Sequence, residues 1–424
     1  MSARSKLALA LSGGGFSGYL FEIGALAALD DAFEGFNVNH FDFYVGVSAG
    51  SAAAALIANG VTPEEILRAN LASERPYYFE RRDIFVPAMW EGFKSIPRAV
   101  QQFSQLAQLY LRNRHDMGLI ELLETAQQSL PGGFYTLDPF ARYLETTFAS
   151  KGLSNTFGGL RHPLYIPAID LDSGQSVIFG EEQWREVPIS KAITASSAAP
   201  LYFCPVRIGG REYIDAGIGR ISCFDLATEK AADLMVIIHP SSQSGLASER
   251  MPGSNGDQEN GRHRGFLSIA DAASRINLEA RLGMALDLHQ RQHPDKFFVI
   301  TPCESLIFER SFLSFRDRIH LLRCGYLSVV QMIKKHLARI GPAFARHGIS
   351  ISAAKIEERM KTRIEQLFRL PQVPSGTLAS APPELAGHRH SEMRGDVRPP
   401  AALPPFRPGQ WAAPQASMRG RKSH

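Results

Sequence analysis

The 424-residue chain lacks a long hydrophobic run. No stretch approaches 18 consecutive apolar residues, so we expect no transmembrane helix. Arg4 and Lys6 precede an apolar run that is too short for a signal peptide and has no small-residue cleavage site. Cysteine is also scarce: the four residues follow neither Cys-x-x-Cys nor zinc-site spacing, and free thiols suit a reducing compartment. We therefore expect a cytoplasmic protein, with any membrane association peripheral.

The body of the chain has no strong charge imbalance. The formal net charge is +4, and residues 371–424 alone carry seven Lys/Arg and three Asp/Glu, which leaves the rest near neutral. A neutral body argues against a nucleic-acid-binding surface. The 371–424 segment holds ten of the 26 prolines and few aliphatic residues, so we expect a disordered, Pro-rich basic tail. Its Pro-x-x-Pro-like spacing at 400–408 is a candidate site for a protein partner.

Apolar residues make up 44% of the chain, enough for a large core. Short apolar runs alternate with helical patterns, such as those at 19–30 and 49–58, which predicts a three-layer α/β/α fold with a mostly parallel central sheet. The predicted strands are residues 7–11, 41–47, 163–169, 176–179, 234–239 and 297–301. We assign the folded domain to residues 5–370.

Two segments interrupt this alternation. Residues 72–135 suit a helical insert, and residues 241–265, which have almost no large apolar side chains, suit a mobile loop. The insert opens with an aromatic and aliphatic cluster at 77–93, interspersed with arginines. Such a cluster suits a lid or an interfacial membrane anchor, and it equally suits core packing of the insert onto the sheet.

A serine lies in the sequence Gly46-Val47-Ser48-Ala49-Gly50, between a predicted strand and an alanine-rich helix. A serine hydroxyl becomes an effective nucleophile when a tight strand-to-helix turn exposes it beside a base. Glycines at the flanking positions remove side chains that would clash in such a turn. Ser48 is therefore the candidate nucleophile, and the alternative is a glycine-rich turn whose serine only caps the helix.

A run of glycines, Gly13, Gly14 and Gly15, follows the first predicted strand. Successive glycine amides at the start of a helix form an anion-binding nest, which an acyl-transfer enzyme needs for its oxyanion. Together with Gly18 they also fit a dinucleotide-binding fingerprint. That fingerprint requires an acidic residue at the end of the second strand, which ends here in Val47-Ser48. We favour the oxyanion hole.

A carboxylate, Asp215, ends a third apolar run and precedes Ala216-Gly217. A small-residue helix that ends at Pro200 lies upstream and can pack closely beneath a site. If all three runs are strands, their carboxyl ends bring the glycines, Ser48 and Asp215 to one edge of the sheet. Asp215 then suits a base acting directly on Ser48.

A Ser–Asp–His triad of the α/β-hydrolase type is the competing arrangement, with His239 or His289 as the base. That fold places several strands before its nucleophile, and the 47 residues before Ser48 leave room for two. A dyad fits better, and the histidines are then packing or surface residues.

These motifs together resemble the patatin-like phospholipases, lipid acyl hydrolases with a catalytic Ser–Asp dyad. The resemblance spans about 7–72 and 162–337 and maps the family's glycine loop, Gly-x-Ser-x-Gly and acid motif onto Gly13–Gly18, Gly46–Gly50 and Asp215–Gly217. The chain departs from the family twice: Ser17 stands where a basic residue is usual, and Asp-Ala-Gly replaces Asp-Gly-Gly. The first departure puts a preference for phospholipid headgroups in doubt.

The resemblance implies hydrolysis of a lipid or another ester through an acyl-Ser48 intermediate, with transient contact to a membrane surface. It implies no metal and no organic cofactor. Two alternatives stay open at this stage: a non-catalytic lipid-binding protein that keeps the fold, and an acyltransferase that uses the same dyad.

Overall fold

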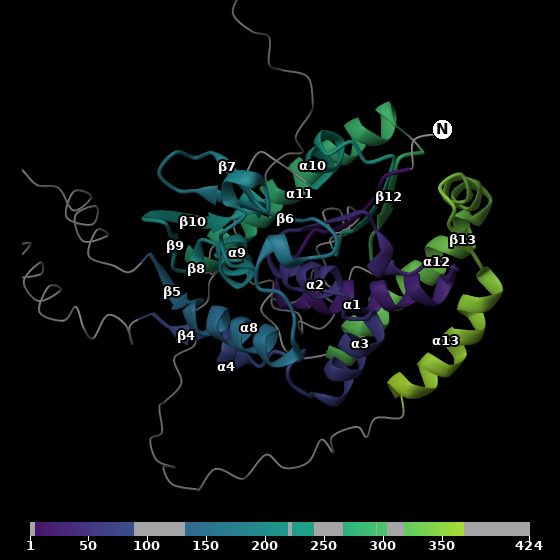
Figure 1. The fold of residues 1–424 in the computed structure, drawn as a ribbon, viewed down its shortest axis with the longest axis horizontal. Helices are drawn as coiled ribbons and strands as arrows, with labels where there is room; N and C mark the ends of the chain where they lie inside the picture. Colours follow the sequence, from purple (N-terminus) through teal and green to yellow (C-terminus); the bar gives the residue numbers. More distant parts are fainter. Residues whose placement is uncertain are drawn as a thin grey trace, which may run out of the picture. The chain divides into compact units, whose positions relative to one another are not determined.

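The computed structural model describes residues 5–88, 132–218, 223–240, 266–293, 295–302 and 318–368 (Figure 1). The chain divides into two units, 1–371 and 372–424, and every described residue belongs to the first. The predicted mobile loop at 241–265, the predicted tail at 371–424 and most of the predicted insert lie outside the described residues.

The central sheet has eight strands in the described part of the chain, and its order is β12-β11-β1-β3-β6-β10-β9, with β7 also paired to β6. The strands β12, β11, β1, β3 and β6 run parallel, whereas β7 and β10 run antiparallel to β6 and β9 runs antiparallel to β10. The strands are β1 (Leu7–Leu11), β3 (Phe43–Gly46), β6 (Leu164–Asp170), β7 (Ser176–Phe179), β9 (Val206–Ile208), β10 (Arg211–Asp215), β11 (Leu234–Ile238) and β12 (Phe297–Ile300).

Helices cover both faces of this sheet. The longer helices are α1 (Gly15–Ala32), α2 (Ala49–Ala58), α3 (Pro63–Ala72), α8 (Asp138–Lys151), α9 (Ile189–Ser196), α10 (Cys223–Glu229), α11 (Phe266–Gln292), α12 (Arg318–Ala345) and α13 (Ala353–Phe368). In β1, Leu9 and Leu11 share a core with α1, α2 and α12, whereas Ala8 and Ala10 share a second core with α10 and α11. Because side chains alternate across a strand, the fold is the expected three-layer α/β/α arrangement with a mostly parallel sheet.

Six short elements complete the described fold, and five of them form two short sheets. The short elements are α4 (Arg81–Ile84), β2 (Phe33–Glu34), β4 (Val86–Pro87), β5 (Gly133–Thr136), β8 (Leu201–Phe203) and β13 (Ser350–Ile351). One short sheet has the order β4-β5-β8, and the other pairs β13 with β2. Single 3₁₀ turns lie at 38–40, 157–159, 182–184 and 216–218. The first short sheet joins both described ends of the predicted insert to β8, close to the carboxyl end of α9.

The predicted elements match the observed ones closely at 7–11, 49–58 and 176–179. The first helix differs, because it starts at Gly15 rather than at Tyr19. Gly14 has φ 101° and turns the chain directly into the helix, so the glycine loop itself forms the helix start. Among the described helices, none combines the length and the apolar character needed to cross a membrane.

Candidate active site

Ser48 lies in the turn between β3 and α2, with φ 51° and ψ −132°. A positive φ is unusual for a residue with a side chain and signals backbone strain. The turn requires glycine at both flanking positions, because a side chain would clash there. A Cβ on Gly46 would lie 2.5 Å from Ser51 Cα, and one on Gly50 would lie 2.7 Å from Leu11 O. The chain therefore forms the tight strand-to-helix turn that its sequence predicts.

Asp215 is the last residue of β10, as expected, but the direction of this strand differs from the expectation. β10 runs antiparallel to β6, and Asp215 pairs with Ala168. Val45 of β3 pairs with Tyr165, so continuing this register by three residues brings Ser48 level with Ala168. β3 and β10 thus approach the same level of β6 from opposite directions, and their ends bring the serine and the carboxylate together.

The two side chains form a direct hydrogen bond. Ser48 Oγ donates to Asp215 Oδ2 at 2.6 Å, and the Gly217 amide donates to Asp215 Oδ1 at 2.7 Å. Asp215 is 7% exposed. Burial raises the pKa of Asp215 to about 6, although the hydrogen bonds from Ser48 and Gly217 oppose this change. A carboxylate with a pKa near neutrality can accept a proton and return it, which suits a general base.

A second serine supports the strained turn. Ser196, at the end of α9, is fully buried, and its Oγ accepts a hydrogen bond from the Ser48 amide at 2.9 Å. The Asp215 amide donates to Ala198 O at 3.0 Å in the same region. The sequence predicts that this small-residue helix packs beneath the site, but it gives no sign that Ser196 holds the backbone of Ser48.

The two candidate histidines of the competing triad lie elsewhere. His239 Nδ1 is 2.7 Å from Ser12 Oγ, and His289 Nε2 is 3.2 Å from Asp225 Oδ1. Burial lowers the pKa of His239 to about 4, so its ring is neutral at pH 7. The described polar contacts of the two rings are thus with Ser12 and Asp225, whereas Ser48 and Asp215 contact each other directly, which favours a two-residue arrangement.

The three glycines of the predicted oxyanion hole differ in what their amides contact. All three have positive φ, at 85°, 101° and 66° for Gly13, Gly14 and Gly15. The Gly13 amide donates to the carboxyl of Glu22 at 2.8 Å. Gly14 and Gly15 lie at the N-terminus of α1, where amides have no acceptor within the helix. These two are therefore better placed than Gly13 to donate to an anion.

Glu22 is a site residue that the sequence interpretation missed. It is the single charged side chain between Gly15 and Leu29, and this is the signal that could have identified it. Ser17, at the position where a basic residue was expected by resemblance, is 2% exposed. Its hydroxyl has no hydrogen-bond partner in the described part of the structure.

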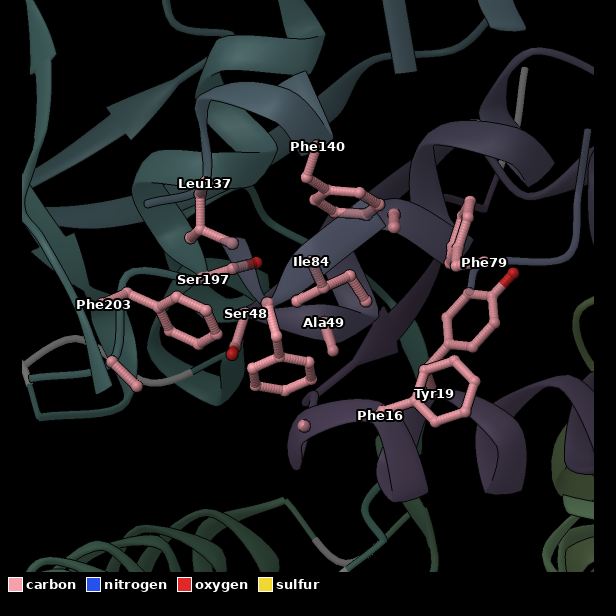
Figure 2. A pocket seen from close by; sticks show the side chains of 14 residues that line it. Phe16, Tyr19, Ser48, Ala49, Phe79, Ile84, Leu137, Phe140, Ser197 and Phe203 are labelled. Carbon is pink, nitrogen blue, oxygen red and sulfur yellow. The ribbon is translucent and has the colours of Figure 1, made fainter. Parts of the chain in front are cut away.

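An apolar pocket opens beside Ser48 (Figure 2). Its empty volume is about 560 Å³, including its opening to solvent. Figure 2 shows aromatic and aliphatic side chains around the serine, with Ser197 close to it. The lining comes from separate parts of the chain and includes Phe16, Phe79, Phe85, Leu137, Phe140 and Phe203.

The start of the predicted insert contributes to this pocket. Phe79 is 2% exposed and packs against Tyr19, Phe140 and Tyr143, with ring centroids 5.1–5.9 Å apart. The described part of the 77–93 cluster thus packs onto the domain and lines the pocket, and residues 89–93 lie outside the described residues. Membrane contact by this cluster stays a prediction.

No group of three or more His, Cys, Asp or Glu side chains in the described ranges has the arrangement of a metal site. The groups that the structure describes beside the pocket are the Ser48 hydroxyl, the Asp215 carboxyl and the backbone amides at the start of α1.

Comparison with known proteins connects this geometry to one family. The family model described as patatin-like phospholipase matches residues 9–222, just over half of the chain. An uncharacterised protein of Acanthamoeba polyphaga mimivirus is 23% identical over 332 residues, which cover 77% of this chain and 93% of that protein. A cGAMP-activated phospholipase of Pseudomonas aeruginosa is 26% identical over 219 residues. That match covers 50% of this chain and 52% of the relative, so it spans about half of each protein.

Two solved structures are also similar. VipD from Legionella pneumophila has a TM-score of 0.35 and 12% identity, with 78% of this chain and 67% of that chain covered. The type III effector protein ExoU has a TM-score of 0.33 and 15% identity, with 85% of this chain and 63% of that chain covered.

Proposed function

Because the chain belongs to the patatin-like phospholipase family, a family of lipid hydrolases, we propose that it cleaves a carboxylic ester of a lipid with Ser48 as nucleophile and Asp215 as general base. One observation carries this proposal: the 2.6 Å hydrogen bond from Ser48 Oγ to a buried Asp215, in a strained turn beside an apolar pocket. This is the pairing of a nucleophile with a base that acyl transfer requires.

The reaction would proceed in two halves. Asp215 accepts the Ser48 proton as Ser48 Oγ attacks the ester carbonyl carbon, and the proton then passes to the departing alkoxide, which leaves as an alcohol. Asp215 next accepts a proton from water, the resulting hydroxide attacks the acyl-serine, and Ser48 recovers its proton as the fatty acid leaves. Both halves use one carboxylate as base and then as acid.

The negative charge on the carbonyl oxygen needs hydrogen-bond donors in both halves. We assign this role to the amides of Gly14 and Gly15 at the N-terminus of α1. Gly15 lines the same pocket as Ser48. The positive end of the helix dipole adds to the effect of these amides. The Gly13 amide, which donates to Glu22, would support the loop instead.

The apolar pocket supports an acyl chain as the part of the substrate that is bound. Rings such as Phe16, Phe140 and Phe203 offer no partner for a polar headgroup, so the headgroup would lie outside this lining. The uncharged Ser17 is fully enclosed and supplies no positive charge for a phosphate. We therefore propose that the substrate is a lipid ester recognised mainly through its acyl chain. The protein would reach this substrate by transient contact with a lipid surface. We also propose a cytoplasmic location.

The test compares the full chain with its Ser48→Ala variant. Both are supplied with chromogenic esters of short and medium chain length, and then with vesicles of mixed phospholipid and neutral lipid. We expect the wild type to release free fatty acid and Ser48→Ala to lose at least about 10³-fold in kcat, as for the loss of a serine nucleophile. Equal activity in both proteins would contradict the proposal.

The same assay separates the alternatives. Addition of a long-chain alcohol reveals an acyltransferase, because new ester would then form at the expense of free fatty acid. If both proteins fold, bind the vesicles and release no fatty acid, the non-catalytic lipid-binding alternative is supported instead.

A further inference from the structure

Glu22 places a carboxyl group inside the core of α1. Its side chain is fully buried, and its neighbours in the helix are almost all buried apolar residues. Burying a carboxyl group costs free energy unless hydrogen bonds or an opposite charge offset the loss of water. The hydrogen bond that stabilises its charged form comes from the Gly13 amide, and no cation is among the groups that act on its pKa. The cost of this residue points to a role beyond packing.

The contact of Glu22 is with the glycine loop. Oε1 accepts the Gly13 amide at 2.8 Å. Oε2 has no hydrogen-bond partner in the part of the chain that the structure describes. Burial raises the pKa of Glu22 well above its ordinary value, and the hydrogen bond from the Gly13 amide opposes this change. The hydrogen bond from Gly13 is thus the one polar contact of this carboxyl group in the described part of the chain.

Glu22 also meets the nucleophile turn. A Cβ on Gly50 would lie 2.9 Å from Glu22 Oε1 and 2.8 Å from the Gly13 amide nitrogen. A Cβ on Gly13 would lie 2.5 Å from Val47 O and 3.0 Å from Ser48 Cβ. The glycine loop, the turn at Ser48 and the Glu22 carboxyl therefore contact one another with no room for a further side chain.

We propose that Glu22 is a positioning residue that orients the oxyanion loop against the nucleophile turn, by holding the Gly13 amide. With this amide fixed, the positive φ angles of the three glycines direct the following amides, Gly14 and Gly15, towards the pocket. This inference rests on the proposed function of Ser48 and of the loop. It assigns Gly13 to the support of the loop and leaves oxyanion binding to Gly14 and Gly15.

Two substitutions separate the hydrogen bond from the packing. Glu22→Leu keeps most of the volume and removes the acceptor, whereas Glu22→Gln keeps a carbonyl oxygen in the place of Oε1. We expect Glu22→Leu to lower kcat about 10²-fold, the scale of a small misplacement of reacting groups, with KM changed by less than about threefold. Glu22→Gln should recover most of that loss.

Asp31→Asn is the matched control, because Asp31 is a second buried carboxyl group of the same helix. It accepts hydrogen bonds from Tyr326 at 2.9 Å and from Arg363 at 2.8 Å, away from the glycine loop. Asp31→Asn should lower the thermal midpoint of unfolding and leave kcat within about twofold of the wild-type value, since the hydrogen-bond partners of Asp31 lie outside the proposed site. A merely structural role for Glu22 would make Glu22→Leu behave like this control.

Hydrogen–deuterium exchange of the peptide covering residues 9–20 provides a readout that needs no activity. We expect faster exchange in Glu22→Leu than in wild type and Glu22→Gln. Unchanged exchange together with unchanged kcat in folded Glu22→Leu would overturn the inference. If wild type hydrolyses no ester, the proposed function fails, and the exchange experiment alone still decides whether Glu22 holds the loop. Should Glu22→Leu not fold, Glu22→Met is measured and interpreted in the same way.

Discussion

At the scale of single residues, the site depends on a few side chains held in costly states. Ser48 adopts a positive φ, Asp215 is 7% exposed, and Glu22 is fully buried. Strained backbone and buried carboxyl groups tend to gather at functional sites, because the surrounding structure must compensate for them. Here that compensation comes from backbone amides and from Ser196 rather than from cations.

The pKa of Asp215 predicts the pH dependence of the reaction. Below about pH 6 the carboxyl group is protonated and cannot accept the Ser48 proton, so kcat/KM should fall about tenfold per pH unit. Above about pH 6 the carboxylate is ionised, and kcat/KM should reach a plateau. The measurement is kcat/KM for a soluble chromogenic ester between pH 4 and pH 9.

Asp215→Asn is the control for this profile. It should have low activity and no limb near pH 6, because the amide does not ionise in this range. A wild-type limb centred near pH 4, the ordinary range of an exposed aspartate, would contradict the role of the buried Asp215. Because folding raises this pKa, the same group should also make the protein less stable as the pH rises from about 4 to about 6.

At the scale of elements, the packing of α1 against α12 holds the helix that carries the glycine loop. The two helices cross with their backbones in contact at two glycines. A Cβ on Gly24 would lie 1.9 Å from Leu322 O, and one on Gly325 would lie 1.9 Å from Phe21 O. Glycine is required at both positions because the atoms that a Cβ would meet belong to the backbone of the other helix and cannot rotate away as a side chain can.

Gly325→Ala should therefore destabilise the protein. We expect a loss of about 3 kcal/mol in the free energy of unfolding, the upper range for overpacking, since the methyl group meets backbone atoms. Gly341→Ala in the same helix is the control: its Cβ would meet only Leu337 Cδ1 at 3.7 Å. That variant should change the free energy of unfolding by less than about 1 kcal/mol, because the helix preference of alanine is opposed by the proline that follows at position 342. Urea unfolding measures both, and equal effects would contradict the close crossing.

At the scale of the whole molecule, the residues of the two cores and of the pocket all belong to the first unit of the chain, residues 1–371. The buried hydrophobic residues of the described structure run from Leu7 to Ile356. They include the strands of the central sheet and helices on both of its faces. We therefore expect the first unit to fold without residues 372–424.

A chain ending at Pro371 tests this expectation. It should unfold cooperatively, with a thermal midpoint within about 2 °C of the full chain and an unchanged kcat for a soluble ester, since it keeps the cores that set its stability. Calorimetry and the chromogenic assay measure the two quantities. A non-cooperative transition would mean that residues 372–424 contribute to the fold.

Local features of the protein were determined by the sequence alone. The strand at 7–11, the helix at 49–58 and the turn at Ser48 follow from apolar runs and from glycines at fixed spacing. Such patterns act over a few neighbouring residues, where backbone preference and side-chain periodicity decide the conformation. The same short motifs carry the family resemblance, which the match to residues 9–222 confirmed.

Relations between distant segments were decided by the tertiary structure. The direction of β10, the support of the Ser48 amide by Ser196 and the hydrogen bond from Gly13 to Glu22 were not apparent in the motifs. Ser48 and Ser196 are 148 residues apart, and Ser48 and Asp215 are 167 apart. Strand direction and side-chain contact over such separations depend on how the layers pack, and no local pattern encodes that packing. The motifs thus identified which residues form the candidate site, and the packing determined how they are held.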